Sequence, residues 1–178
     1  HTLLSLMDTT VTSMGSRLLK KWLNDPIVDT SELDSRLDWL ESAIESNQSF
    51  PIRKELEPLS DLERICSRIE LGAATPRDLA RLRDDIPCFS RIKEVAGRIQ
   101  SSLSKNLLDS LDNFDPLFQR LEEALVEDPP PHLREGGVFA EGYDQSLDQL
   151  RAHKADSGTA LRDLELQARQ RPRSQTLK

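Results

Sequence analysis

The sequence predicts an all-α protein: an elongated bundle of about six to seven helices, with a long projecting C-terminal helix and a small β or loop element near residues 129–143. Only 37% of the 178 residues are hydrophobic and 4% are aromatic, while 31% are charged. A core must therefore be built mainly from Leu, Ile and Val beneath a large solvated surface. Apolar residues recur at spacings of three and four between capping signals, which is typical of amphipathic helices. The length fits one hydrophobic core.

Two helices are predicted near the N-terminus. The first covers residues 13–24 and stops before Pro26, because proline disfavours a helical residue in front of it. Its helically spaced apolar residues are Met14, Leu18, Leu19, Trp22 and Leu23. The second helix begins at Asp29, which has the capping-box spacing with Glu32, and it reaches Asn47. Its single apolar stripe consists of Leu33, Leu37, Leu40 and Ile44.

The central part of the chain is divided by prolines and capping signals. One or two helical turns are predicted between Pro51 and Pro58. Ser60 and Glu63 repeat the capping-box spacing before a helix that Gly72 is expected to end.

The Thr75-Pro76 pair predicts the start of the next helix. The threonine hydroxyl can accept an orphan N–H, and the fixed φ of proline suits the first helical position. The apolar run that follows extends to Ile92 and contains Pro87. This proline should kink the helix or remove one hydrogen bond, at a cost of about 3 kcal/mol.

The next part of the chain combines two shorter helices with an irregular segment. The helices are predicted at about 102–113 and 116–126, with Asp115 capping the second. Residues 127–143 hold three prolines and three glycines around a short apolar run, so a loop with a small β element is expected there. The glycines of this segment should supply positive φ angles and room for close packing.

The C-terminal part reads as one long helix. Asp144 is the expected N-cap, and no proline follows until Pro172, which allows a helix of about 27 residues and ~40 Å. Its near-heptad apolar track consists of Leu147, Leu150, Leu161, Leu164 and Ala168. We therefore divide the chain into a helical body, residues 1–143, and a helical arm, residues 144–178.

Charge is unevenly distributed along the chain. The net charge is −7, yet residues 162–178 carry five basic and two acidic side chains, so this end is +3. Phosphate binding depends on clustered Lys and Arg, which makes the C-terminal end the candidate for contact with DNA. The candidate residues are Arg169, Arg171, Arg173 and Lys178. A basic helix end favoured by the helix dipole is the competing interpretation.

Catalytic and metal-binding patterns are not found. The three histidines lack the spacing of a metal site, and the glycine-rich stretch EGGVFAEGYD has no Lys followed by Ser or Thr, as a phosphate loop requires. No apolar run is long enough for a membrane span, and the first residues do not resemble a signal peptide. Cys66 and Cys88 are interpreted as reduced, buried thiols.

Other polar and aromatic residues have structural interpretations. Neighbouring carboxylates such as Asp84 and Asp85 are expected on a solvated helix face. Trp22 and Trp39 sit on apolar stripes and are expected in the core. Catalytic residues, metals and cofactors are therefore not expected in this chain.

Three stretches resemble the MutS family of DNA mismatch-repair proteins. They are SLMDTTVTSMGSRLLKKWLNDPI at 5–27, DLERICSRIELGAATPRDLARLRD at 61–84 and PPPHLREGGVFAEGYDQSLDQLR at 129–151. They correspond to the family patterns SLxDxTxTxMGxRxLxxWLxxP, DLER…R…G…A…PRDL and PP…REGG-V-x-x-GYDxxLDxLR. Two departures, Ser13 in place of proline and Ser146 in place of an acidic residue, fall near helix starts.

The resemblance implies that the chain is the first lever segment of a larger protein, ending near the start of a DNA clamp. It implies that ATP with Mg²⁺, mismatched duplex DNA and a homodimer partner belong to that parent protein, a bacterial cytoplasmic protein associated with the nucleoid. The fragment itself is expected to be a monomer without a membrane segment.

Within this resemblance, the expected function is mechanical. A helix has internal backbone hydrogen bonds, so tilting its base moves its tip, and the lever would couple ATP-driven changes elsewhere to the clamp. Residues of the motifs and of the arm are the expected structural and coupling positions. They are Gly15, Trp22, Gly136, Gly137, Tyr143, Asp144, Leu161 and Leu164. The alternative is a generic helical module for protein–protein interaction.

Overall fold

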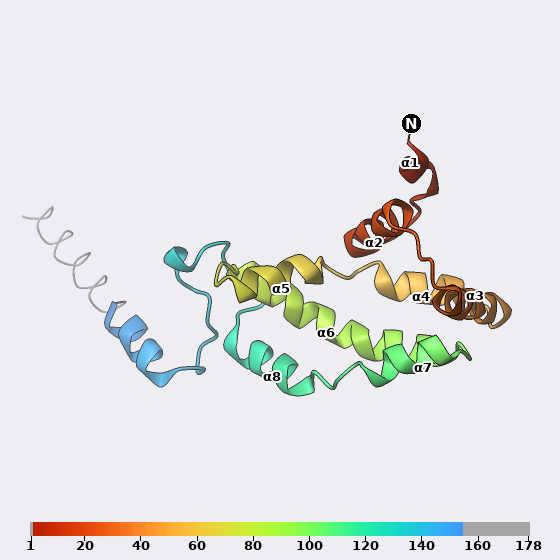
Figure 1. The fold of residues 1–178 in the computed structure, drawn as a ribbon. Helices are drawn as coiled ribbons and strands as arrows, with labels where there is room; N and C mark the ends of the chain where they lie inside the picture. Colours follow the sequence, from red (N-terminus) through yellow and green to blue (C-terminus); the bar gives the residue numbers. More distant parts are fainter. Residues whose placement is uncertain (1, 155–178) are drawn as a thin grey trace, which may run out of the picture. The chain divides into compact units, whose positions relative to one another are not determined.

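The computed structural model describes residues 2–154 (Figure 1). The chain divides into two compact units, residues 1–138 and 139–178. The predicted functional division between residues 143 and 144 stays a prediction.

The first unit is built from helices joined by short turns. In chain order they are α1 (Leu3–Met7), α2 (Ser13–Asn24), α3 (Thr30–Glu45), α4 (Ser49–Leu56), α5 (Leu62–Glu70), α6 (Pro76–Ala96), α7 (Ser102–Asp109), α8 (Asp115–Ala124) and the 3₁₀ turn η1 (Leu133–Glu135). The described residues contain more helices than the six or seven predicted, and no strand. The predicted all-α class is confirmed, and α2 has the predicted bounds.

Helix α1 was not predicted from the sequence. It has only five residues, too few for a hydrophobic period to be recognised. Thr2 and Ser5 stabilise its start through a reciprocal capping box.

Two predicted capping boxes are wrong in detail. Asp29 does cap α3, but Glu32 binds Arg36 at 2.7 Å, so it does not complete a capping box. Helix α5 is capped by Asp61 and not by Ser60. The i,i+4 ion pair competes for Glu32, and a carboxylate at the next position replaces the serine hydroxyl as the acceptor.

Helices α7 and α8 are shorter than predicted. Helix α7 ends at Asp109, and Phe114, not Asp115, is the N-cap of α8. The Asn113 Oδ1 accepts a hydrogen bond from the Asp115 N–H at 2.9 Å. This local turn competes with helical geometry and separates the two helices.

Helix α6 is the centre of the first unit and packs against α4, α5, α7 and α8. Figure 1 shows it running between α5 and α8. It starts as predicted, with Thr75 as N-cap and Pro76 in the first turn. It continues through Pro87, which has no N–H to donate to the Arg83 carbonyl, so the predicted loss of one hydrogen bond is confirmed.

Buried polar groups fix α6 to its neighbours. Asp85 is buried, and its carboxylate accepts from the Ser60 N–H at 3.2 Å. Arg83 is also buried and donates to the carbonyls of Val126 and Glu127 at 3.1 and 3.0 Å. The prediction that Asp85 lies on a solvated helix face is therefore wrong. The part-buried Ser60 N–H before α5 needs an acceptor, and the Asp85 carboxylate supplies it.

A small apolar cluster joins α8 to the segment after it. Ala124, Leu125 and Val138 are buried, with Leu79 and Leu121 packed against them. The predicted small β element is not confirmed: the segment contains η1 and a backbone hydrogen bond of 3.1 Å from the Val126 N–H to the Val138 carbonyl.

Helix α3 packs against α7, but it buries only Ala43. Its predicted apolar stripe lies on the surface, with exposed fractions from 44% to 67%.

The prediction that both cysteines are buried is correct for one of them, since Cys88 is buried and Cys66 is exposed.

The described part of the second unit contains a helix over residues 145–154. The Leu147 N–H donates to the Asp144 carboxylate at 3.0 Å, which confirms Asp144 as the N-cap. The rest of the predicted long helix lies outside the described residues. In the part of the chain that the structure describes, no helix has the length and apolarity needed to cross a bilayer.

Candidate functional site

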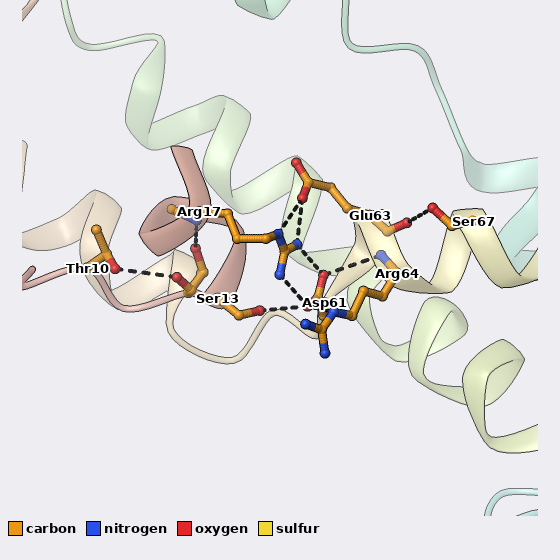
Figure 2. Close-up of polar contacts among 9 residues, drawn as sticks. Thr10, Ser13, Arg17, Asp61, Glu63, Arg64 and Ser67 are labelled. Atoms are coloured by element: carbon orange, nitrogen blue, oxygen red, sulfur yellow. Dashed lines mark hydrogen bonds and ion pairs between the residues drawn. The ribbon is translucent and has the colours of Figure 1, made fainter. Parts of the chain in front are cut away.

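The first and second sequence motifs meet at an ion-paired joint between α2 and α5 (Figure 2). The Arg17 guanidinium donates to both carboxylate oxygens of Asp61, at 2.8 and 2.6 Å. It also donates to the Glu63 Oε2, through Nε at 2.9 Å and Nη2 at 2.5 Å. A planar guanidinium suits this paired recognition of carboxylates, so the joint fixes orientation as well as distance.

Asp61 is the centre of this joint. Besides Arg17, it accepts from the Ser13 hydroxyl at 2.9 Å and from the Arg64 N–H at 3.3 Å, as N-cap of α5. The Arg17 hydrogen bonds hold the pKa of Asp61 well below its usual range, although partial burial acts in the opposite direction. The two carboxylates likewise raise the pKa of Arg17, so the joint stays ionised near neutral pH.

A second polar network shapes the loop that leads into α2. The Asp8 carboxylate accepts from the hydroxyls of Ser16 and Thr10 at 2.5 and 2.6 Å, and these bonds lower its pKa. Thr12 caps α2 by accepting from the Gly15 N–H at 3.0 Å. A Cβ on Gly15 would lie 3.1 Å from the Thr12 Oγ1 and 3.3 Å from the Thr10 Cβ. Gly15 therefore allows the loop to approach the helix.

Trp22 connects α2 to α3 in a way that the sequence did not predict. Trp22 is 41% exposed and is not a core residue. The Arg36 guanidinium lies 4.0 Å from the ring centroid, which is cation–π geometry. Arg36 comes from the neighbouring helix, so no periodicity within α2 could have indicated this contact.

Within the second motif, Arg68 on α5 binds Asp78 on α6. The Arg68 Nε and Nη2 donate to the two Asp78 oxygens at 2.8 and 2.5 Å. Asp78 also accepts from the N–H and hydroxyl of Thr75, both at 2.9 Å. The pKa of Asp78 falls to about 2, mainly because of the Arg68 hydrogen bonds.

The third motif contains a turn rich in glycine. Gly136 has φ +74° and ψ −179°, a region that is essentially restricted to glycine. Gly137 has φ +72°, so the predicted positive φ angles are confirmed. An added Cβ at either glycine would meet no described atom within 4 Å, so the predicted close packing is wrong.

The same motif fixes the base of the helix over residues 145–154. The Tyr143 ring stacks on Phe139, with centroids 5.9 Å apart and planes 6° apart. Asp148 accepts from the Gly142 N–H at 2.7 Å and pairs with Arg151 at 3.1 Å. Arg151 also donates to the Phe139 carbonyl at 2.9 Å. We call the contacts of Asp148 and Arg151 the helix-base clamp.

The three motifs match a known family. A sequence profile described as MutS domain III matches residues 1–177. The chain belongs to the MutS domain III family. The DNA mismatch repair protein MutS of Halothermothrix orenii is 35% identical over 177 residues, which are 99% of this chain and 20% of that protein. The MutS domain III chain thus spans about one fifth of the relative's length.

The described part of this MutS domain III chain has no group of three or more His, Cys, Asp or Glu side chains arranged to hold a metal ion. Its polar residues form joints between helices, which are suited to fixing relative orientation. The sequence patterns did not single out Arg17, Asp61 and Glu63 of the joint between α2 and α5, nor Asp148 and Arg151 of the helix-base clamp.

The remaining predicted positions lie outside the described residues. They are the candidate DNA contacts Arg169, Arg171, Arg173 and Lys178 and the coupling positions Leu161 and Leu164. Of the other predicted MutS domain III positions, Gly15 and Trp22 lie near the α2 start and on α2, whereas Gly136, Gly137, Tyr143 and Asp144 lie around the turn before the last described helix.

Proposed function

We propose that the chain is the domain III segment of a longer protein that acts in DNA mismatch repair. The observation that carries this proposal is the family match over residues 1–177, together with 35% identity to a DNA mismatch repair protein MutS. In this proposal the whole protein binds mismatched duplex DNA, hydrolyses ATP and is a homodimer. The isolated segment is a monomer.

ATP and Mg²⁺ are assigned to another part of the longer protein. The described residues provide no cluster of metal ligands, and the glycine-rich turn before residue 145 lacks the Lys of a phosphate loop.

The finer proposal is that the chain transmits movement to the DNA clamp. The helix-base clamp supports it, because Asp148 and Arg151 tie the first turns of the helix to the preceding turn by side-chain bonds of 2.7–3.1 Å. A helix held in this way moves with its base as one body. Transmission further requires two states with different contacts, which the experiment must detect.

The test breaks the helix-base clamp in the full-length parent. In Arg151→Ala and Asp148→Ala variants we expect ATP-dependent release of a mismatched duplex to slow, while ATP hydrolysis without DNA is retained. Arg98→Ala is the control, because it removes an exposed i,i+4 pair with Glu94 on α6. Leu161→Pro with Leu164→Pro should have the larger effect. Unchanged release in all these variants would contradict the lever proposal.

A weak DNA contact at the C-terminal end is a separate proposal. The net charge of +3 over residues 162–178 supports it. Binding of the chain to duplex DNA should weaken with salt and show no mismatch preference. The measurement is a salt titration before and after neutralising Arg169, Arg171, Arg173 and Lys178. An unchanged slope would indicate that the basic residues only complement the helix dipole.

The alternative function is a helical module for protein–protein interaction, and the exposed stripe on α3 favours it. The sequence of the parent gene beyond residue 178 distinguishes the mismatch-repair function from the interaction module. A GxxxxGK[ST] sequence downstream supports the mismatch-repair ATPase, and its absence from the full reading frame supports the module.

A further inference from the structure

Helix α3 carries a regular row of exposed apolar side chains. We call Leu33, Leu37, Leu40 and Ile44 the apolar row. Their spacings of three and four residues place them on one face over about three turns. The exposed fractions lie between 44% and 67%, although an amphipathic helix normally buries such a face. The contacts of α3 with α7 leave the apolar row uncovered.

A row of acidic residues runs beside the apolar row. We call Asp34, Asp38, Glu41 and Glu45 the acidic row, and all four are exposed. Each follows a member of the apolar row by one position, so the acidic row lies about 100° further around the helix axis. The two rows therefore form parallel strips along the same helix.

The acidic row has no compensating charge in the part of the chain that the structure describes. None of its four side chains forms an ion pair or a hydrogen bond there. The one arginine of α3, Arg36, is engaged with Glu32 and with the Trp22 ring. Four unpaired carboxylates at helical spacing repel one another, and a row of cations would relieve that repulsion.

We propose that the two rows of α3 are a docking surface for an amphipathic helix with an apolar stripe flanked by a basic row. That helix is supplied by the parent polypeptide outside residues 1–178. The proposal rests on the part of the proposed function that makes this chain a segment of a longer protein.

Geometry and charge favour a helix as the occupant. A straight apolar strip of about three turns is matched by a second helix packing ridges into grooves. The adjacent negative strip selects a partner with Lys or Arg beside its own apolar stripe and fixes its direction.

Two observations favour a segment of the same polypeptide over a second copy of α3. The chain spans 20% of the length of the MutS relative, so most of the parent lies outside it. An antiparallel pair of α3 helices would bring two acidic rows together, which is destabilising. A parallel pair would offer each acidic row only Arg36, which is already engaged with Glu32 and Trp22.

The experiment uses the full-length parent with the photoreactive residue p-benzoylphenylalanine in place of Leu37. After irradiation, mass spectrometry identifies the attached peptide. We expect one peptide from outside residues 1–178, with apolar residues at i, i+3, i+4 and i+7 beside Lys or Arg. The same substitution at Leu71, which is 80% exposed and outside both rows, is the matched control. Mixing isotopically labelled and unlabelled subunits distinguishes attachment within a subunit from attachment to a second copy.

Attachment to a second copy, attachment within residues 1–178, or yields no higher than at Leu71 would each overturn the proposal. A stability measurement provides an independent readout. Leu37→Gln should lower the melting temperature of the parent more than Leu71→Gln does, and equal decreases would also count against docking. If the parent neither bound mismatched DNA nor hydrolysed ATP, the proposed function would fail. The cross-linked peptide and the melting temperatures would still decide the docking proposal.

Discussion

Helices α6 and α3 are the two longest of the helices α1–α8, and they differ in how much of their surface other elements cover. Helix α6 has 21 residues and buries eight of them, whereas α3 has 16 residues and buries one. Both have apolar residues at helical spacing. Periodicity therefore identifies the apolar face of a helix but does not show whether that face has a partner within the chain.

The two helices also use charge differently. Helix α6 places Asp78, Arg83 and Asp85 inside the unit, each bonded to a neighbouring element. Helix α3 leaves its acidic row exposed. Buried polar groups must be satisfied within the fold, while exposed ones can remain solvated or meet another part of the protein.

The largest expected effect concerns apolar burial. Ile86→Ala on α6 should destabilise the chain by about 2–5 kcal/mol, because Ile86 is 5% exposed and truncation leaves a cavity. Leu37→Ala on α3 should change stability by less than about 0.5 kcal/mol in the same chain. Urea unfolding of both variants measures the contrast. Equal losses would show that α3 is covered within the 178 residues.

The next effect compares the arginines of the two helices. Arg83→Met should cost about 2–3 kcal/mol, because the carbonyls of Val126 and Glu127 lose their donor. Arg36→Met should cost about 0.5–1 kcal/mol, the value of a partly exposed cation–π contact with Trp22. Thermal unfolding at neutral pH gives both values. A larger loss for Arg36 would reverse the comparison.

The pH dependence separates two carboxylates within α6. The pKa of Asp78 is lowered from 3.8 to about 2, so its contribution to stability is present above pH 4 and is lost as the pH falls towards 2. Burial raises the pKa of the Asp85 carboxyl, so the contribution of this group to stability is present at low pH and is lost as the pH rises above the ordinary carboxyl pKa. Asp78→Asn should flatten the loss of stability between about pH 4 and 2. If the free energy of unfolding fell equally between about pH 4 and 2 with and without Asp78→Asn, this assignment would be contradicted.

The smallest effect concerns the helix starts. Thr75→Ala should cost about 1–2 kcal/mol, because it removes one half of the capping box with Asp78. Asp29→Ala should cost about 0.5–1 kcal/mol, because its cap is a single bond to the Ser31 N–H at 2.9 Å. Chemical denaturation of the two variants tests the order, and a reversed order would indicate that α3 is the better anchored helix.

The positions of the helices could be predicted from the sequence more accurately than the contacts of the site. Sequence reasoning placed the bounds of α2, the start of α6 at Thr75 and the N-cap at Asp144, because caps and periods depend on neighbouring residues. It did not pair Arg17 with Asp61, since these residues are 44 positions apart and many carboxylates could have been the partner.

The burial of individual side chains could not be predicted from the sequence either. Asp84 and Asp85 are adjacent and chemically identical, yet only Asp85 lies against the Ser60 N–H inside the unit. Trp22 was expected in the core and lies under a guanidinium at the surface. These outcomes depend on which element packs nearby, and single-helix patterns do not contain that information.

The helical class, most helix positions and, through three motifs, the membership in the MutS domain III family could be predicted from the order of residues alone. Those properties follow from local propensity, capping and residue order along the chain. The packing of the helices, in contrast, brings the first two motifs together at Arg17 and Asp61, buries Asp85 and leaves the apolar row of α3 exposed. The reason is physical: ion pairing and burial depend on the distance between elements that are far apart in the chain.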